Sequence, residues 1–249
     1  MKKTIIRKIT LTAILTILVI IFTKVLSIQN PPFPIPPFVR ISIGPALIIF
    51  ASIYLGPFFG ALVGVLSDVL GWVAFNFSGL SFSPLITIIY LFLGILPWVI
   101  NRVLTKISFM KIDKTIFIIL LLFMNLYLGF FFVSEDSFMV QGIVYNLNIT
   151  LKIVLFCASI LISILTYVVT YLIDKKYHHN TFQVAIVTLI SEILLMVILG
   201  SYIKAFFFGA SFFFVLVSQI LVLFINVPLN TFMVSLLQYL LQKRRKTIK

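Results

Sequence analysis

Charged residues are scarce in this chain. Only 10% of its 249 residues are Asp, Glu, Lys or Arg, whereas 62% are hydrophobic. A soluble domain of this composition could not cover its own core with polar surface. In a bilayer the apolar side chains can face lipid, provided that backbone groups pair within helices or a closed barrel. The apolar runs are long and do not alternate as barrel strands do, so we expect an all-α bundle of transmembrane helices.

Acidic residues, histidine and cysteine are also few, which restricts the possible chemistry. The chain has six carboxylates, two histidines and one cysteine, Cys157. No Cys or His cluster has metal-ligand spacing, and no intramolecular disulfide can form. Neither a phosphate-binding Gly-x-x-x-x-Gly-Lys-Ser/Thr loop nor a Gly-x-Ser-x-Gly motif occurs. We therefore expect no metal, no cofactor, no enzymatic activity and no ATP hydrolysis by that route.

Eight apolar segments are candidate spans, because about 20 mostly apolar residues cross a bilayer. The second is short, and only Gly56-Pro57 separates it from the third. A basic segment precedes the first, as in a signal peptide, but no small-residue cleavage site follows, so we expect a retained helix. The candidates are 9–28, 44–57, 59–77, 84–104, 115–133, 149–173, 182–203 and 211–241.

The basic residues predict the topology. All but four of the 19 lie at the N-terminus, between 102 and 114, at 175–176 or at the C-terminus. Cytoplasmic loops carry an excess of Lys and Arg, so eight spans with both termini in the cytoplasm of a bacterial plasma membrane fit best. The net charge of +13 has no recognition motif beside it, so we expect no nucleic-acid partner. The four remaining basic residues, expected on the outer side, are Lys24, Arg40, Lys152 and Lys204.

The loop at 29–39 is rich in proline and cannot be helical, because proline has no amide proton and disfavours helix in the residue before it. It predicts a stiff outer loop carrying Phe33 and Phe38, which is either a rigid spacer or a lid over an outward-facing pocket. Asp68 lies in a glycine-rich span, and an ionisable residue there normally faces a polar cavity or a partner.

Other polar residues are expected at the outer half of the bundle, namely Arg40, Lys204, Asn226 and Asn230. Cations, amides and aromatic rings together suit capture of a flat, partly anionic organic molecule. Singly, each of these residues is also explained by snorkelling or by hydrogen bonding between helices. A binding site is favoured because all four residues are expected on the same side of the membrane.

The run from Arg40 to Gly71 resembles the substrate-binding (S) components of energy-coupling factor (ECF) vitamin transporters, most closely the folate family. Residues 82–84 resemble the start of that family's fourth helix, and 211–241 resemble its last helix. The likeness covers about 1–104 and 181–241. The motifs that carry it are Arg40-x-x-x-Gly44, Gly56-Pro57-x-x-Gly60, Asp68-x-x-Gly71 and Phe82-Ser83-Pro84.

The resemblance implies a six-helix core at 1–104 and 181–249, with 105–180 as a two-helix insertion. It implies a subunit that captures a vitamin, folate or a related pterin by preference, from outside. Uptake would then be driven by a transmembrane coupling subunit and two ATPases. The family's first helix often docks through Ala-x-x-x-Ala, for which this chain offers Thr12, Ala13 and Thr16. The expected substrate-binding residues are Phe33, Phe38, Arg40, Asp68, Phe82, Glu192, Lys204, Asn226 and Asn230.

Two alternatives stay open. The same scaffold could bind another vitamin or a small heterocycle, since a fold does not fix its ligand. A protein of a different class, either a small membrane enzyme or an assembly factor, would also fit the composition. Of the six carboxylates only Asp68 and Glu192 fall within the candidate spans, which leaves such an enzyme few groups for acid–base chemistry.

Overall fold

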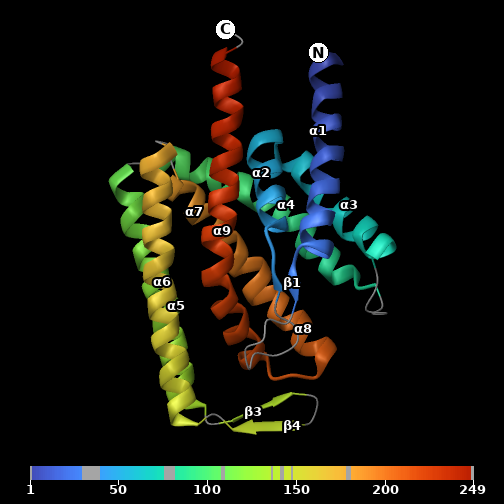
Figure 1. Cartoon of the computed structure of the whole chain (residues 1–249). Coiled ribbons are helices and arrows are strands. Elements are labelled where there is room, and N and C mark those ends of the chain that lie inside the picture. The colour runs from blue at the N-terminus through green and yellow to red at the C-terminus, as the bar shows by residue number, and fades with distance from the viewer. Residues whose placement is uncertain are drawn as a thin grey trace.

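The computed structural model describes residues 2–29, 40–75, 82–107, 110–135, 137–140, 143–146, 148–177 and 181–247. Over these ranges the chain forms a helical bundle, which confirms the expected all-α membrane architecture (Figure 1). The helices are α1 (Lys2–Ile20), α2 (Gly44–Leu55), α3 (Pro57–Phe75), α4 (Pro84–Ile107), α5 (Met110–Ser134), α6 (Ile149–Tyr177), α7 (Thr181–Glu192), α8 (Gly200–Phe208) and α9 (Phe212–Thr247).

Two helices change their hydrogen-bonding pattern partway. The π-helical segment η1 (Ile21–Val25) continues α1, and η2 (Ile193–Leu199) joins α7 to α8. The chain also has two short antiparallel strand pairs, of which β3–β4 lies at the end of the bundle away from the termini and β1 lies nearer its middle (Figure 1). They are β1 (Ile28–Gln29) with β2 (Arg40–Ile41), and β3 (Ser137–Val140) with β4 (Ile143–Asn146).

Seven helical segments in the described ranges are long and apolar enough to cross a membrane. The remaining candidate span is α2, whose 12 residues rise only about 18 Å, against about 30 Å of hydrocarbon. Almost all of α2 is buried among its neighbours. It still reverses the chain between α1 and α3, and Figure 1 places both termini at the same end of the bundle.

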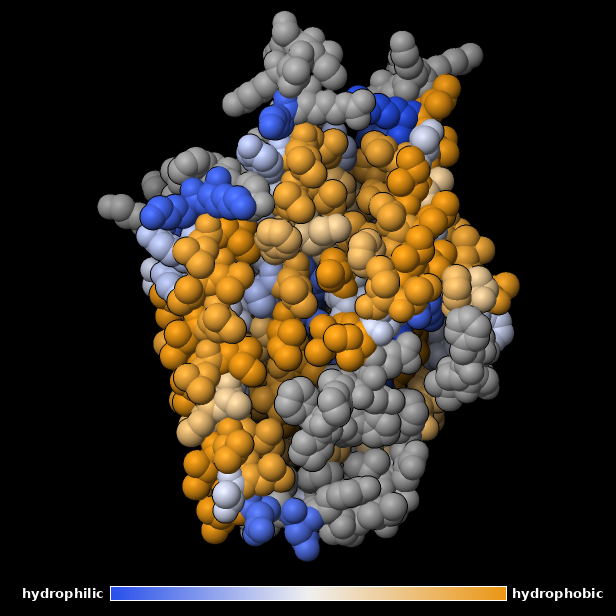
Figure 2. Space-filling view, in the orientation of Figure 1, coloured by the Kyte–Doolittle hydropathy of each residue, from blue (hydrophilic) through white to orange (hydrophobic). Residues whose placement is uncertain are grey.

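The outer surface of the bundle is apolar between its two ends. Figure 2 shows an orange belt along the flank, with hydrophilic patches above and below it. Large side chains on α5 are among the most exposed, including Phe123, Phe130 and Val133. In water such a surface would be unstable, but in a bilayer it faces lipid. The belt therefore agrees with a multi-pass membrane protein.

Helices α3 and α4 approach so closely that their backbones touch. A Cβ atom on Gly60 would meet the carbonyl oxygen of Gly94, and one on Gly64 would meet that of Tyr90. Gly56, with φ of 101°, makes the tight turn between α2 and α3 in a backbone conformation that glycine adopts without strain. Small residues that allow helix backbones to approach are a common means of packing in membranes, and here they fix the α3–α4 register.

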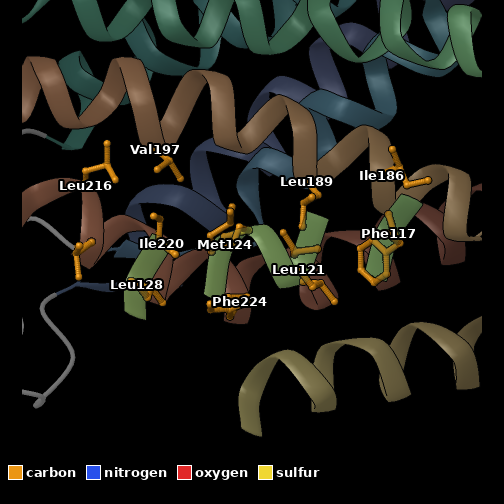
Figure 3. Close-up of a cluster of buried hydrophobic side chains, with 14 of the residues drawn as sticks. Phe117, Leu121, Met124, Leu128, Ile186, Leu189, Val197, Leu216, Ile220 and Phe224 are labelled. Carbon is orange, nitrogen blue, oxygen red and sulfur yellow. The ribbon is translucent and has the colours of Figure 1, made fainter. Parts of the chain in front are cut away.

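Helices α5 and α6 pack against α7 and α9 through large side chains. The buried cluster between them includes Phe117, Leu128, Ile186 and Phe224, and Figure 3 shows these side chains interdigitating. The segment expected as an insertion, 105–180, is therefore joined to the bundle by an apolar core. Its division from the rest stays a prediction.

A proline in α9 is compensated by a hydroxyl from α6. Pro228 has no N–H to donate to the carbonyl of Phe224, one turn earlier. The Thr166 hydroxyl donates to that carbonyl oxygen at 2.9 Å. An unsatisfied carbonyl inside a membrane is costly, so this bond ties α6 to the middle of α9.

Candidate substrate-binding site

The site begins at Asp68, on the buried face of α3. Its carboxylate accepts a hydrogen bond of 2.6 Å from the hydroxyl of Thr87 on α4. The two residues face each other because α3 and α4 run antiparallel in the register that the contacts of Gly60 and Gly64 fix. As expected for an ionisable residue within a span, Asp68 has a polar partner.

Two basic residues from other elements lie near this carboxylate, and a third lies near one of them. Lys24 from η1 and Arg40 from β2 both lie within electrostatic range of Asp68. Lys204 from α8 lies within electrostatic range of Arg40. The stem of Lys24 packs against Gly71, where an added Cβ would be 3.0 Å from the lysine Cε. Elements distant in sequence thus bring three cations and one carboxylate into one charged cluster.

Asn226 on α9 holds the strand that carries Arg40. Its amide nitrogen donates to the backbone carbonyl of Arg40 at 3.3 Å, and its amide oxygen accepts from the backbone N–H of Ser42 at 3.4 Å. The Ser42 hydroxyl in turn donates to the carbonyl of Phe22 at 3.0 Å. Asn226, expected as a substrate ligand, therefore has a positioning role: it pairs with β2 as a neighbouring strand would.

Aromatic side chains continue the site along α3 and α4. Phe82 packs edge-on against Trp72, with ring centroids 5.3 Å apart, one turn beyond Asp68. Tyr90 on α4 lies within electrostatic range of both Arg40 and Asp68. Phe33 and Phe38, expected to close over a ligand, lie outside the described residues.

Glu192 and Asn230 meet each other instead of joining this cluster. The Asn230 amide donates to the Glu192 carboxylate at 2.6 Å, inside the bundle. Asn230 lies one turn beyond Asn226 on α9, towards the termini. The structure therefore divides the expected binding residues into two groups. The charged cluster contains Arg40, Asp68, Phe82, Lys204 and Asn226, and Glu192 with Asn230 forms a separate pair.

The residues expected to dock a partner lie on two faces of α1. Thr12 and Thr16 are buried, and their hydroxyls donate to carbonyls of their own helix, those of Lys8 and Thr12. Ala13 is exposed. Of the three, Ala13 is the residue open to a partner in this arrangement.

Four residues of this site were not among the sequence candidates. Lys24 was recognised only as a basic residue expected on the outer side, and Trp72, Thr87 and Tyr90 were ordinary members of apolar spans. No local motif marks them, because their place in the site depends on how α1, α3 and α4 are packed. The one available signal was the antiparallel pairing of α3 with α4, which sets Thr87 opposite Asp68.

The cluster has the chemistry of an anion-binding site. Three cations beside one carboxylate leave an excess of formal positive charge, and the aromatic rings of Trp72 and Phe82 adjoin it. Among the described residues no group of three or more His, Cys, Asp or Glu side chains could hold a metal ion. The chain matches no protein-family model, no curated protein and no solved structure. Its functional assignment therefore rests on these residues and their arrangement.

Proposed function

We propose that this protein is the substrate-binding subunit of an ECF-type importer, and that it captures a vitamin from outside the cell. The observation that carries the proposal is the cluster of Lys24, Arg40, Asp68 and Lys204. Charged side chains inside a membrane protein are costly, and they are usually found where they bind a ligand or line a transport pathway. The cluster lies on the side away from the basic termini, which is the outer side if the basic ends are cytoplasmic.

Folate or a related pterin is the favoured ligand. Folate ends in a glutamate with two carboxylates, which would match the excess of positive charge left after Asp68 is balanced. Its flat rings would suit the aromatic side chains of Trp72 and Phe82. Asp68, with its free acceptor capacity, would suit the N–H donors of a pterin ring.

The short extended β1–β2 pair supports the idea of a water-accessible recess beside the charged cluster. Backbone that is not helical is tolerated in the bilayer only where protein buries it or water reaches it. The β1–β2 pair follows the end of the first span and precedes the half-length helix α2. Such a recess would let a charged vitamin reach Arg40 without crossing lipid.

The ligand is best identified by extracting small molecules from the protein purified in detergent and analysing them by mass spectrometry. A folate or pterin would support the proposal, another vitamin would replace the ligand within the same function, and a lipid-like enzyme product would refute it. Copurification from native membranes should also bring down a transmembrane coupling subunit and two ATPase subunits.

Arg40→Ala tests the site directly. Truncating one partner of a buried charge pair typically costs 2 kcal/mol or more, so the affinity for folate should fall by about 30-fold or more. Binding is measured by fluorescence titration of the purified protein. The matched control is Arg102→Ala, which removes the same charge from the other end of the bundle, where Arg102 stacks on Trp98. Equal affinities in the two variants would refute the role of Arg40.

Partner docking is tested at the exposed position of α1. Ala13→Trp places a bulky ring on the surface without touching the buried Thr12 and Thr16. We expect it to prevent copurification of the coupling subunit while leaving vitamin binding unchanged. Leu122→Trp, at an exposed position on α5, is the control. Assembly that is unaffected by Ala13→Trp would rule out docking through this face.

A further inference from the structure

A second polar cluster lies in the interior of the bundle, between α7 and α9. Glu192 is 2% exposed and Asn230 is 0% exposed, and the amide of Asn230 donates to the Glu192 carboxylate at 2.6 Å. Among the described residues Asn230 is the one hydrogen-bond partner of this carboxylate. The cluster does not depend on the vitamin-binding proposal, because it involves different residues and a different depth.

This pair is incompletely balanced. A carboxylate buried in a membrane protein needs a compensating positive charge or strong hydrogen bonds, and one neutral amide supplies a single bond. The amide itself is also incomplete, since Oδ1 of Asn230 is buried and has no hydrogen-bond partner in the described structure. The Glu192 carboxylate and Oδ1 of Asn230 are therefore two buried hydrogen-bond acceptors that are not fully satisfied.

Four hydroxyls around the pair share this lack of a partner. They are fully or almost fully buried, with at most 1% of their surface exposed. Elsewhere in the bundle, hydroxyls such as those of Thr16 and Thr170 donate to a carbonyl of their own helix, as is usual for Ser and Thr in helices. Seven hydroxyls in the described residues are buried without a hydrogen-bond partner, and the four nearest the pair in sequence are Thr188, Ser191, Thr231 and Ser235; the others are Ser83, Thr181 and Ser201.

The register of α7 against α9 sets the level of each hydroxyl. Thr188 lies four residues before Glu192 on α7 and so occupies the same helix face. Because α7 and α9 run antiparallel with Glu192 opposite Asn230, Ser191 lies level with Thr231. By the same register Thr188 lies within one residue of the level of Ser235. These polar residues of α7 and α9, which we call the α7–α9 seam, thus lie at neighbouring levels of the two helices.

The backbone changes its pattern at the same place. The α-helical bonding of α7 ends at Glu192, and the π-helical segment η2 begins at the next residue. Short π-helical segments within α-helices occur frequently at functional sites, because they cost stability and redirect side chains. This observation is independent of the unpartnered oxygens.

We propose that the α7–α9 seam is a binding site for a monovalent cation of the sodium class. The ligands are the Glu192 carboxylate, Oδ1 of Asn230 and the hydroxyl of Thr188, with further oxygens from the neighbouring hydroxyls. Oxygen atoms of carboxylate, amide and hydroxyl groups are the ligands that hard cations prefer. A single carboxylate neutralises one positive charge, which favours a monovalent over a divalent ion in a low-dielectric interior.

The test is thermal unfolding of the full-length protein in detergent at fixed pH and ionic strength, with sodium replaced stepwise by choline. A ligand that binds only the folded state stabilises it, so the unfolding temperature should rise by about 5 °C between about 1 mM and about 300 mM sodium. An unfolding temperature that stays the same as choline replaces sodium would overturn the proposal, since the folded protein would then have no site that distinguishes the metal ion from choline.

Glu192→Gln should abolish the sodium response while raising stability in choline, because it removes the unbalanced charge but keeps an acceptor for Asn230. Thr188→Val is the second variant, in case the first does not fold. If the Thr188 hydroxyl does not bind the cation, its replacement by a methyl group will leave the sodium response unchanged. If the hydroxyl is a ligand, its loss will weaken the response several-fold. Asp68→Asn, in the charged cluster, should keep the full sodium response. A sodium response that survives both seam variants would refute the site.

Discussion

The two sides of the bundle are held together in different ways. Between α3 and α4 the backbones touch at Gly60, Gly64 and Gly94, with no side chain between them. Between α5, α7 and α9 the contacts come from large side chains such as Phe117 and Phe224. Backbone contact leaves no adjustable atoms, whereas interdigitated side chains can repack. The charged cluster at Asp68 lies on the first side, which suggests that rigid spacing matters most where charges are positioned.

The largest effect is expected from Gly64→Ala. The added methyl group would collide with the carbonyl oxygen of Tyr90, so the two helices must separate. Overpacking of this kind, where backbone blocks the space, should lower the free energy of unfolding by about 3 kcal/mol or more. Unfolding of the purified protein by titration with a denaturing detergent measures this value.

Gly129→Ala on α5 is the matched control. A Cβ there would lie 3.1 Å from the ring of Phe156, which is a side chain that can move. The cost should stay below about 1 kcal/mol. Equal destabilisation by the two glycine variants would show that the two sides do not differ in rigidity.

Phe117→Leu tests how far the large-side-chain core can repack. Phe117 is fully buried and packs edge-on against Phe182, with centroids 5.9 Å apart. Leucine is smaller, but the neighbouring side chains can fill part of the space that the ring leaves, so the exchange should cost about 1 kcal/mol in the same unfolding assay. A loss as large as that of Gly64→Ala would mean that this core is as specific as the glycine contacts.

An effect similar to that of Phe117→Leu is expected from Thr166→Val, which removes the hydroxyl bonded to the carbonyl of Phe224. Side-chain hydrogen bonds between membrane helices contribute about 0.6 kcal/mol on average, and this one also satisfies a carbonyl freed by Pro228. We therefore expect a loss of about 1 kcal/mol. Ser163→Ala, whose hydroxyl bonds only to its own helix, should cost less. The reverse order would show that the proline needs no compensation.

Much of the fold follows from the sequence because membrane helices are specified by length and hydropathy. The long apolar runs predicted helices at every described span, and Gly56-Pro57 correctly marked the turn between α2 and α3. The π-helical segments η1 and η2 were not foreseen, since their hydrogen-bond pattern depends on packing and not on composition. The half-length of α2 was visible in the sequence, but its burial on almost all sides was not.

The site was only partly predictable. Arg40, Asp68 and Lys204 were identified because charges within or beside apolar spans are unusual, and they do lie in one cluster. Thr87 was missed because a threonine in a span gives no signal until its neighbour is known. Asn230 was expected beside Asn226 at the outer half of the bundle and Glu192 was expected in the same site, whereas helix packing pairs these two residues with each other.

The short helix α2 constrains how the protein enters the membrane. A segment of 12 residues is too short to be stable alone across the bilayer, so it cannot be inserted as an independent span. The Gly56 turn joins it directly to α3, and the Lys8 side chain of α1 donates to the carbonyl of Leu55 at its end at 3.3 Å. We expect α2 and α3 to enter together as a hairpin after α1 is in place, so that biogenesis of this region is cooperative over three helices.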